Sequence, residues 1–229
     1  MSEKNAIIIG STGGIGEALT RQLTAQGYTI TALSRTSTPP IDLTDEATIA
    51  AAATHLAANA PYDLILVATG ILQTATIAPE KAFRDLTPAT LATYFAVNAT
   101  GPALIAKQFL PLLPKTGRGV FAALSARVGS IGDNRLGGWY GYRASKAALN
   151  MLIKTLAIEV ARSRPDAIVV ALHPGTVDTR LSKPFQRGVA PDKLFTADTS
   201  AEQLLAVIDR LTPAETGDCF AWDGERITP

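Results

Sequence analysis

The chain has 229 residues, of which 47% are hydrophobic and 18% are charged, with a formal net charge of +1. This balance excludes the strong field of a nucleic-acid-binding or membrane-surface protein, and we expect neither partner. Cys219 is the one cysteine, residues 6–9 form too short an apolar run for a signal segment, and no stretch approaches the roughly 18 apolar residues of a membrane span, so we expect a cytoplasmic protein.

Short apolar runs alternate with longer helical patterns along the chain. In order, we expect a strand over 6–9, a helix over 15–26, strand 28–33, helix 46–59, strand 63–68, helix 87–110, strand 119–124, helix 140–162, strand 167–172, helix 200–211 and strand 219–222. Apolar strands separated by helices indicate a parallel sheet covered on both faces. We predict one α/β domain over 1–229, a Rossmann-type doubly wound sheet of about seven strands in three layers, with a substrate-loop insertion at about 179–199.

A glycine-rich turn joins the first strand to the first helix. Glycines allow positive φ and close approach of a ligand, and a helix N-terminus favours a phosphate. The spacing Gly-x-x-x-Gly-x-Gly differs from the usual dinucleotide fingerprint, and no P-loop Lys-Ser/Thr pair follows it. A tight turn without a ligand is the alternative. Because of its place after the first strand, we predict a cofactor site made by Gly10, Ser11, Thr12, Gly14, Ile15 and Gly16.

The end of the second strand bears on which dinucleotide binds. An NAD site places a carboxylate there for the ribose hydroxyls, but this chain has Ser34 and Arg35. A guanidinium beside a hydroxyl suits a 2′-phosphate. We therefore predict NADP(H) in preference to NAD(H), the alternative being an ordinary surface arginine.

Tyr142 and Lys146 lie one helical turn apart. Their face continues through Leu149 and Ile153 as an apolar stripe that should pack on the sheet. Helices of this fold begin at the edge of the sheet where ligands bind. A nearby ammonium would stabilise phenolate and lower the pKa of the tyrosine. The alternative is a snorkelling lysine beside a core tyrosine.

Further motifs follow in a fixed order: Asp42-Leu43, Val97-Asn98 and Pro174-Gly175-x-Val177-x-Thr179. With the glycine turn and the Tyr-Lys pair, they resemble the short-chain dehydrogenase/reductase family over essentially the whole chain. The stretch from Ser125 to Lys146 is most similar to the branch of C-factor and the sniffer-type carbonyl reductases.

This resemblance implies roles for individual residues. Tyr142 would be the general acid, Lys146 would hold the nicotinamide ribose and depress the tyrosine pKa, and Asn98 would keep a water in a proton relay. Further cofactor contacts would come from Asp42 and Leu43 at the adenine, from Ala68, Thr69 and Gly70 near the adenosine, and from Pro174, Gly175, Val177 and Thr179 at the carboxamide. The resemblance also implies a homodimer or homotetramer.

The chain differs most from the family pattern at the catalytic serine that follows the fifth strand. Related sequences usually carry Ser-Ser after the fifth strand, with the second serine catalytic, whereas this chain has Ser125-Ala126. Successive side chains of a strand point to opposite faces of the sheet. Ser125 would therefore point to the face opposite that of the usual catalytic serine, unless a bulge turns it. We predict Ser125 as the catalytic serine, with Ser130 or neither residue as the alternatives.

Three further interpretations concern a metal site, a hydrolase triad and an apolar substrate pocket. His55 and His173 lie far apart without clustered carboxylates, so we expect no metal site. A hydrolase triad of Ser125, an aspartate and His173 lacks its Gly-x-Ser-x-Gly elbow. An apolar substrate pocket could form under a lid over 180–196, or the same side chains could cover core or a subunit interface; they are Leu136, Trp139, Phe185 and Phe195.

These observations lead to two functional hypotheses. The first is an NADPH-dependent oxidoreductase that transfers hydride to a small ketone or aldehyde, with a small carbonyl or alcohol compound as substrate. The second is a nicotinamide-binding sensor or signalling protein of the same fold with little or no turnover, which Ala126 favours.

Overall fold

The computed structural model describes residues 4–229. Its centre is a parallel sheet of six strands in the order β2-β1-β3-β4-β5-β8. The strands are β1 (Lys4–Ile9), β2 (Tyr28–Leu33), β3 (Leu64–Val67), β4 (Gly119–Leu124), β5 (Ala167–His173) and β8 (Cys219–Ala221). The doubly wound fold is confirmed, with six strands rather than about seven in this sheet. Two further short strands, β6 (Thr176–Val177) just before the predicted insertion and β7 (Leu194–Phe195) within it, pair with each other in a separate small sheet.

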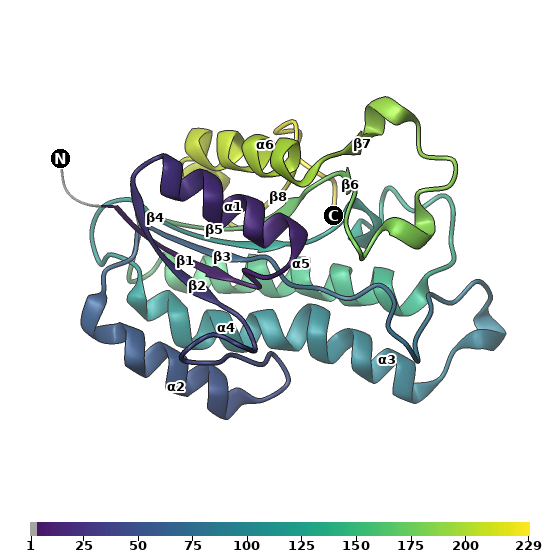
Figure 1. The fold of residues 1–229 in the computed structure, drawn as a ribbon, viewed down its shortest axis with the longest axis horizontal. Coiled ribbons are helices and arrows are strands. Elements are labelled where there is room, and N and C mark those ends of the chain that lie inside the picture. The colour runs from purple at the N-terminus through teal and green to yellow at the C-terminus, as the bar shows by residue number, and fades with distance from the viewer. Residues whose placement is uncertain (1–3) are drawn as a thin grey trace.

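Helices cover both faces of the sheet (Figure 1). They are α1 (Gly14–Ala25), α2 (Glu46–Leu56), α3 (Pro88–Phe95), α4 (Gly101–Phe109), α5 (Tyr140–Val160) and α6 (Ala197–Arg210). Helices α1 and α6 lie together on one face, and α2, α4 and α5 lie on the other (Figure 1).

The alternation of side chains along the strands produces the two cores. On β1, Ile7 and Ile9 face the core that includes Phe109 of α4, whereas Ile8 faces the core that includes Leu19 of α1. All five side chains are at most 1% exposed. Burying each of them contributes roughly 1.5–3 kcal/mol relative to leaving it in water. Because both faces are buried, the inner strands β3, β4 and β5 are apolar almost throughout, which is why the sequence could identify them.

The helix expected over 87–110 is interrupted. Helix α3 passes into a π-helical turn at Ala96–Thr100 before α4 begins. Such a turn inserts an extra residue and shifts the helical phase without changing the composition, so the sequence pattern alone did not indicate it. Asn98 lies within this turn.

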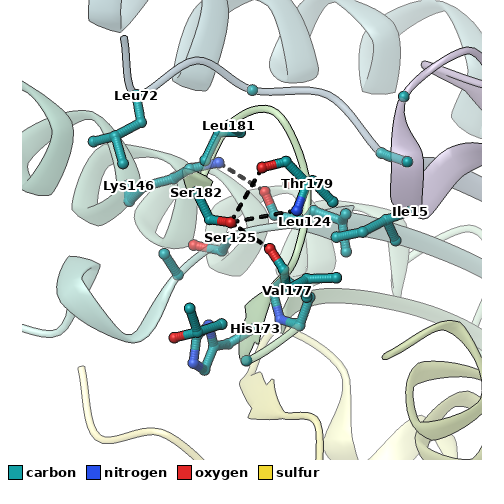
Figure 2. Close-up of a pocket in the computed structure, with 18 of the residues that line it drawn as sticks. Ile15, Leu72, Leu124, Ser125, Lys146, His173, Val177, Thr179, Leu181 and Ser182 are labelled. Carbon is teal, nitrogen blue, oxygen red and sulfur yellow. Dashed lines mark hydrogen bonds between the residues drawn. The ribbon is translucent and has the colours of Figure 1, made fainter. Parts of the chain in front are cut away.

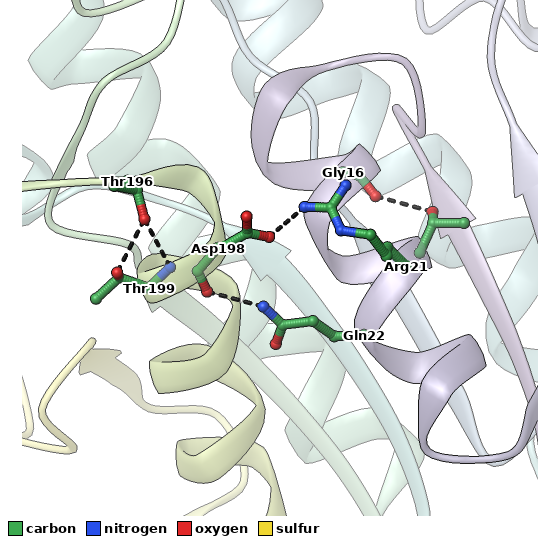
Figure 3. A network of polar contacts seen from close by, with 7 residues as sticks. Gly16, Arg21, Gln22, Thr196, Asp198 and Thr199 are labelled. Atoms are coloured by element: carbon green, nitrogen blue, oxygen red, sulfur yellow. Dashed lines mark hydrogen bonds and ion pairs between the residues drawn. The ribbon is translucent and has the colours of Figure 1, made fainter.

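Helix α6 begins three residues earlier than expected because Thr196 caps it, accepting a hydrogen bond from the Thr199 N–H. Asp198 in its first turn forms an ion pair with Arg21 of α1, and its carbonyl oxygen accepts a hydrogen bond from Gln22 at 2.8 Å (Figure 3). The end of the insertion is thereby tied to the helix that follows the glycine turn.

The edge strand β8 carries the single cysteine. Cys219 is buried, and burial raises the pKa of its thiol to about 12. Within residues 4–229, no helix combines the length and apolar character needed to cross a membrane.

Candidate active site

A cavity of about 660 Å³ opens at the carboxyl ends of the strands, which is where ligands bind in this class of fold. Its wall runs from the start of α1 to the start of α5 and includes part of the insertion (Figure 2). The predicted site residues that line it are Thr12, Gly14, Ile15, Ala68, Thr69, Gly70, Ser125, Tyr142, Lys146, Pro174, Gly175, Val177 and Thr179. Eight predicted residues are absent from the lining: Gly10, Ser11, Gly16, Ser34, Arg35, Asp42, Leu43 and Asn98.

The glycine turn is tight enough to require two of its glycines for steric reasons. Gly10 has φ +87, and a Cβ on Gly16 would lie 2.2 Å from the Gly10 carbonyl oxygen. The Gly10 and Ser11 N–H groups both donate to the carbonyl oxygen of Leu33 at the end of β2. These residues therefore shape the turn, while Gly14 and Ile15 at the start of α1 face the cavity.

The segment after β2 lies outside the cavity. Ser34 is buried and its hydroxyl contacts Thr36, whereas Arg35 is exposed. The Asp42 carboxylate accepts hydrogen bonds from the Thr44 hydroxyl at 2.7 Å and the Thr44 N–H at 2.8 Å. Those bonds, with a smaller contribution from the charge of Arg35, lower the pKa of Asp42.

The π-helical turn directs Asn98 toward the loop after β3. Its side chain is fully buried; Oδ1 accepts from the Ile71 N–H at 2.8 Å, and Nδ2 donates to the Ile71 carbonyl oxygen at 2.9 Å. Nδ2 also lies 3.2 Å from the Ser145 hydroxyl, which donates to the Tyr142 carbonyl oxygen. Ser145 thus links Asn98 to α5, a role that its place in the sequence did not suggest.

Tyr142 and Lys146 are both buried at the start of α5. The Lys146 Nζ lies 5.9 Å from the centre of the Tyr142 ring and donates to the Leu124 carbonyl oxygen at 2.8 Å (Figure 2). A Cβ built on Gly70 would lie 3.4 Å from both this Nζ and the Asn98 Oδ1. The structure therefore brings the tyrosine, the lysine and the asparagine together at one end of the cavity.

The pKa shifts at this end differ from our expectation. Burial, with a smaller contribution from Tyr94, raises the pKa of Tyr142, whereas we predicted that Lys146 would lower it. The prediction was wrong because loss of hydration dominates at this phenol, while the Lys146 ammonium lies 5.9 Å from the centre of its ring. Burial also lowers the pKa of Lys146 to about 8.

The hydroxyls of the two candidate serines have other partners. The Ser125 N–H donates to Leu172, continuing the β4–β5 ladder, and its hydroxyl donates to the Asn150 Oδ1 at 2.6 Å. The Ser130 hydroxyl accepts from the Asp133 N–H, and Ser130 does not line the cavity. Beside Tyr142, the cavity wall is formed instead by the methyl group of Ala126.

The predicted apolar pocket is half right. Trp139 and Phe185 line the cavity, and their rings contact each other edge to face with 5.2 Å between the ring centres. Leu136 is 92% exposed, and Phe195 packs against Trp222 rather than lining the cavity. Residues that the sequence did not single out complete this wall, namely Leu72, Val128, Leu181 and Val189.

His173 lies at the end of β5 with its Nδ1 buried, and within residues 4–229 that atom has no hydrogen-bond partner. Burial is the main cause that lowers the pKa of His173 to about 4. A hydrolase triad needs a carboxylate at this nitrogen. The structure therefore contradicts that alternative.

A doubly wound sheet with a cavity at the carboxyl ends of its strands places the protein among the Rossmann-type nucleotide-binding folds. The model of the short chain dehydrogenase family matches residues 4–190, and the chain belongs to this family. It is therefore an NAD(P)-dependent oxidoreductase, and the resemblance found in the sequence is confirmed.

Individual proteins are similar to this chain in sequence or in fold. C-signal of Myxococcus xanthus is 35% identical over 147 residues, covering 64% of this chain and 82% of that protein. The 1-hydroxy-2-glutathionyl-2-methyl-3-butene dehydrogenase of Rhodococcus sp. is 28% identical over 230 residues, covering 95% and 96%. Two solved structures match over 100% of both chains: the NADPH-bound carbonyl reductase from chicken fatty liver, with a TM-score of 0.83 and 23% identity, and the carbonyl reductase Sniffer of D. melanogaster, with 0.84 and 22%.

Proposed function

We propose that the protein is an NADPH-dependent reductase of a small ketone or aldehyde, in which Tyr142 is the general acid. The observation that carries this proposal is the convergence of Tyr142, Lys146 and Asn98 beside Gly70, at the end of a cavity that begins at the glycine turn. All three side chains are at least nine-tenths buried. Burying a lysine and an asparagine without a chemical task is costly, and perturbed groups of this kind concentrate at catalytic sites.

The residues fit a dinucleotide. Helices α2, α3 and α6 begin with a capping side chain, supplied by Asp45, Thr87 and Thr196. Helix α1 has Gly13 at its N-cap position and no side-chain cap, and its first residues line the cavity. A phosphate would satisfy the N–H groups of this first turn and interact favourably with the helix dipole.

The segment after β2 favours NADP(H) over NAD(H). Arg35 is exposed and close enough to Asp42 to lower the pKa of that carboxyl, so its guanidinium is available to a 2′-phosphate beside the adenosine. Ser34, beside it, is buried with its hydroxyl bonded to Thr36, so Arg35 is the residue that would contact the 2′-phosphate. Similar solved structures that are described as bound to NADPH or NADP agree with this preference.

The chemistry of the chain's own residues then follows. When bound, the dinucleotide would supply hydride to the carbonyl carbon. The Tyr142 phenol donates its proton to the carbonyl oxygen, and its raised pKa keeps it protonated until then. Lys146, with a pKa of about 8, is mostly cationic at neutral pH and stabilises the phenolate that remains. Asn98 holds a water through which Lys146 returns a proton to the tyrosine.

Consumption of NADPH over a panel of aliphatic and aromatic ketones and aldehydes tests the proposal. In Tyr142→Phe we expect kcat to fall by about 10²–10⁴-fold, the usual contribution of a general acid, while the NADPH Kd stays within twofold. Ser125→Ala is a matched loss of one hydroxyl at the same cavity, and we expect a smaller effect because that hydroxyl is engaged by Asn150. Tight NADPH binding without turnover of any carbonyl would contradict the proposal and favour the sensor hypothesis.

A further inference from the structure

Glu80 is a buried acidic residue outside the machinery described so far. It lies in the loop between β3 and α3 and is 3% exposed. Its Oε2 accepts a hydrogen bond from the Gly141 N–H at 3.1 Å. Its Oε1 is buried, and within residues 4–229 it has no hydrogen-bond partner. A carboxylate buried with a single hydrogen bond is energetically costly, so its presence requires an explanation.

The start of α5 supplies that explanation. Trp139, which precedes the helix, has φ +51 and provides no side-chain cap. Helices α2, α3 and α6 are capped by the residue that directly precedes them. Helix α5 is instead capped by Glu80, which is 61 positions away from Gly141 in the sequence. A negative charge at a helix N-terminus is favourable.

Glu80 contacts the helix start a second time through its backbone. The Trp139 N–H donates to the Glu80 carbonyl oxygen at 2.6 Å. A Cβ built on Gly141 would lie 2.4 Å from Cδ2 of Tyr94 and 2.9 Å from Oε1 of Glu80. Two N–H groups at the start of α5, those of Trp139 and Gly141, thus donate hydrogen bonds to Glu80. The packing leaves no room for a side chain at position 141.

This turn carries the groups that face a substrate. Tyr142 follows Gly141 directly, and its ring lies 6.3 Å from those of both Tyr94 and Trp139, in edge-to-face contacts. We propose that Glu80 is a positioning residue, which fixes the first turn of α5 and thereby the direction of the Tyr142 phenol and the Trp139 wall of the cavity. This role rests on the proposed function of Tyr142 as general acid.

Two conservative variants separate the effect of the length of the Glu80 side chain from the effect of its charge. Glu80→Gln keeps an oxygen that can accept from the Gly141 N–H but removes the charge, whereas Glu80→Asp keeps the charge but is one methylene too short. We expect kcat to fall about tenfold to a hundredfold in Glu80→Asp, as for a catalytic group misplaced by about 1 Å, and to stay within about threefold of the parent in Glu80→Gln. The NADPH Kd should change less than twofold in both.

Asp85→Ala is the matched control. It removes a neighbouring carboxylate of the same loop, which accepts hydrogen bonds from the Lys81 and Ala82 N–H groups. We expect it to lower the Tm without changing kcat. If kcat in the Glu80 variants simply follows Tm, or if Glu80→Asp is more active than Glu80→Gln, the positioning role is overturned.

A measurement that needs no turnover keeps the two proposals apart. Hydrogen exchange at the Gly141 amide should be at least tenfold faster in Glu80→Asp than in the parent and nearly unchanged in Glu80→Gln. If the parent reduces no carbonyl, the proposed function fails while this experiment still tests the contact. Equal exchange rates in the parent and Glu80→Asp would overturn the role of Glu80 whatever the activity.

Discussion

The two ends of the cavity are built in different ways. At the glycine turn, the wall includes Gly13 and Gly14, which have no side chains to cover their backbone, and the neighbouring charged residue, Arg35, is exposed. At the other end, Asn98, Tyr142 and Lys146 are buried. Asn98 accepts a hydrogen bond from the Ile71 N–H and donates to the Ser145 hydroxyl, Lys146 donates to the Leu124 carbonyl oxygen, and Tyr142 is held by aromatic contacts.

The difference separates binding from chemistry. A backbone wall can cradle phosphates of any dinucleotide, and an exposed side chain can adjust the choice among them at little cost to stability. A proton donor must instead be fixed within a fraction of an ångström, which requires buried partners. We therefore expect changes at the first end to alter Kd and changes at the second to alter kcat. Of the following predictions, given in order of decreasing effect, those for Gly16, Arg35 and Ala126 test this division, and the one for His173 tests the energetic cost of a buried group at the same cavity.

Gly16→Ala should have the largest effect. Its Cβ would lie 2.2 Å from the Gly10 carbonyl oxygen, so the turn must open, at a cost of about 3 kcal/mol. We expect NADPH binding, measured by fluorescence titration, to weaken about a hundredfold. In Gly13→Ala the nearest atom would be 3.4 Å away, so the fold should tolerate the methyl. Equal loss of stability in both variants would contradict the steric argument.

His173 should make stability depend on pH. Its pKa in the folded protein is about 4, below the ordinary value of 6.5, so between these values the unfolded chain binds a proton that the folded chain does not. Stability should therefore fall as the pH falls from 7 to 5, by about 2 kcal/mol from this residue. Urea unfolding of His173→Gln should show a correspondingly smaller fall. His55→Gln, which changes an exposed histidine, should behave as the parent does.

Arg35→Ala should alter the choice of cofactor. Loss of charge-assisted bonds to a 2′-phosphate is expected to weaken NADPH binding about tenfold and leave NADH binding unchanged. Arg162→Ala, another exposed arginine, at the far end of α5, is the control. If the parent binds NADH as tightly as NADPH, the phosphate contact of Arg35 is refuted.

Ala126→Ser should have the smallest effect and the opposite sign. A hydroxyl at this cavity-lining position would add a second donor to the carbonyl oxygen beside the Tyr142 phenol. One neutral hydrogen bond of about 1 kcal/mol corresponds to a rise in kcat of about fivefold. Steady-state kinetics on the best substrate of the panel would measure it, and a fall in kcat would show that the cavity excludes the hydroxyl.

The sequence predicted those elements whose pattern is local. Strands β2 and β4 were predicted over the residues they occupy, and the other sheet strands to within one or two residues. The inner strands β3, β4 and β5 are identifiable because a strand buried on both faces is apolar at nearly every position. The Tyr142-Lys146 pair was found because a shared helix face has a fixed spacing. Their proximity to Asn98 was an implication of the family resemblance.

The rest depends on contacts between distant segments. Nothing around Glu80 in the sequence marks it as buried, since the cap it supplies belongs to a helix 61 residues away. Leu136 has the composition of a pocket residue, but its loop turns it outward. The π-helical turn around Asn98 leaves the helical composition unchanged, so it becomes visible only in the backbone.

The buried thiol on β8 has a practical consequence. Alkylating reagents such as iodoacetamide attack thiolate, and a pKa of about 12 leaves very little of it at neutral pH even before access is considered. Cys219 also lies on a strand at the edge of the sheet, in register with β5 along three residues. Modification of the native chain therefore has to await separation of these two strands. The rate of Cys219 alkylation therefore reports the rate at which the sheet edge opens, and it can be measured without any substitution in the protein.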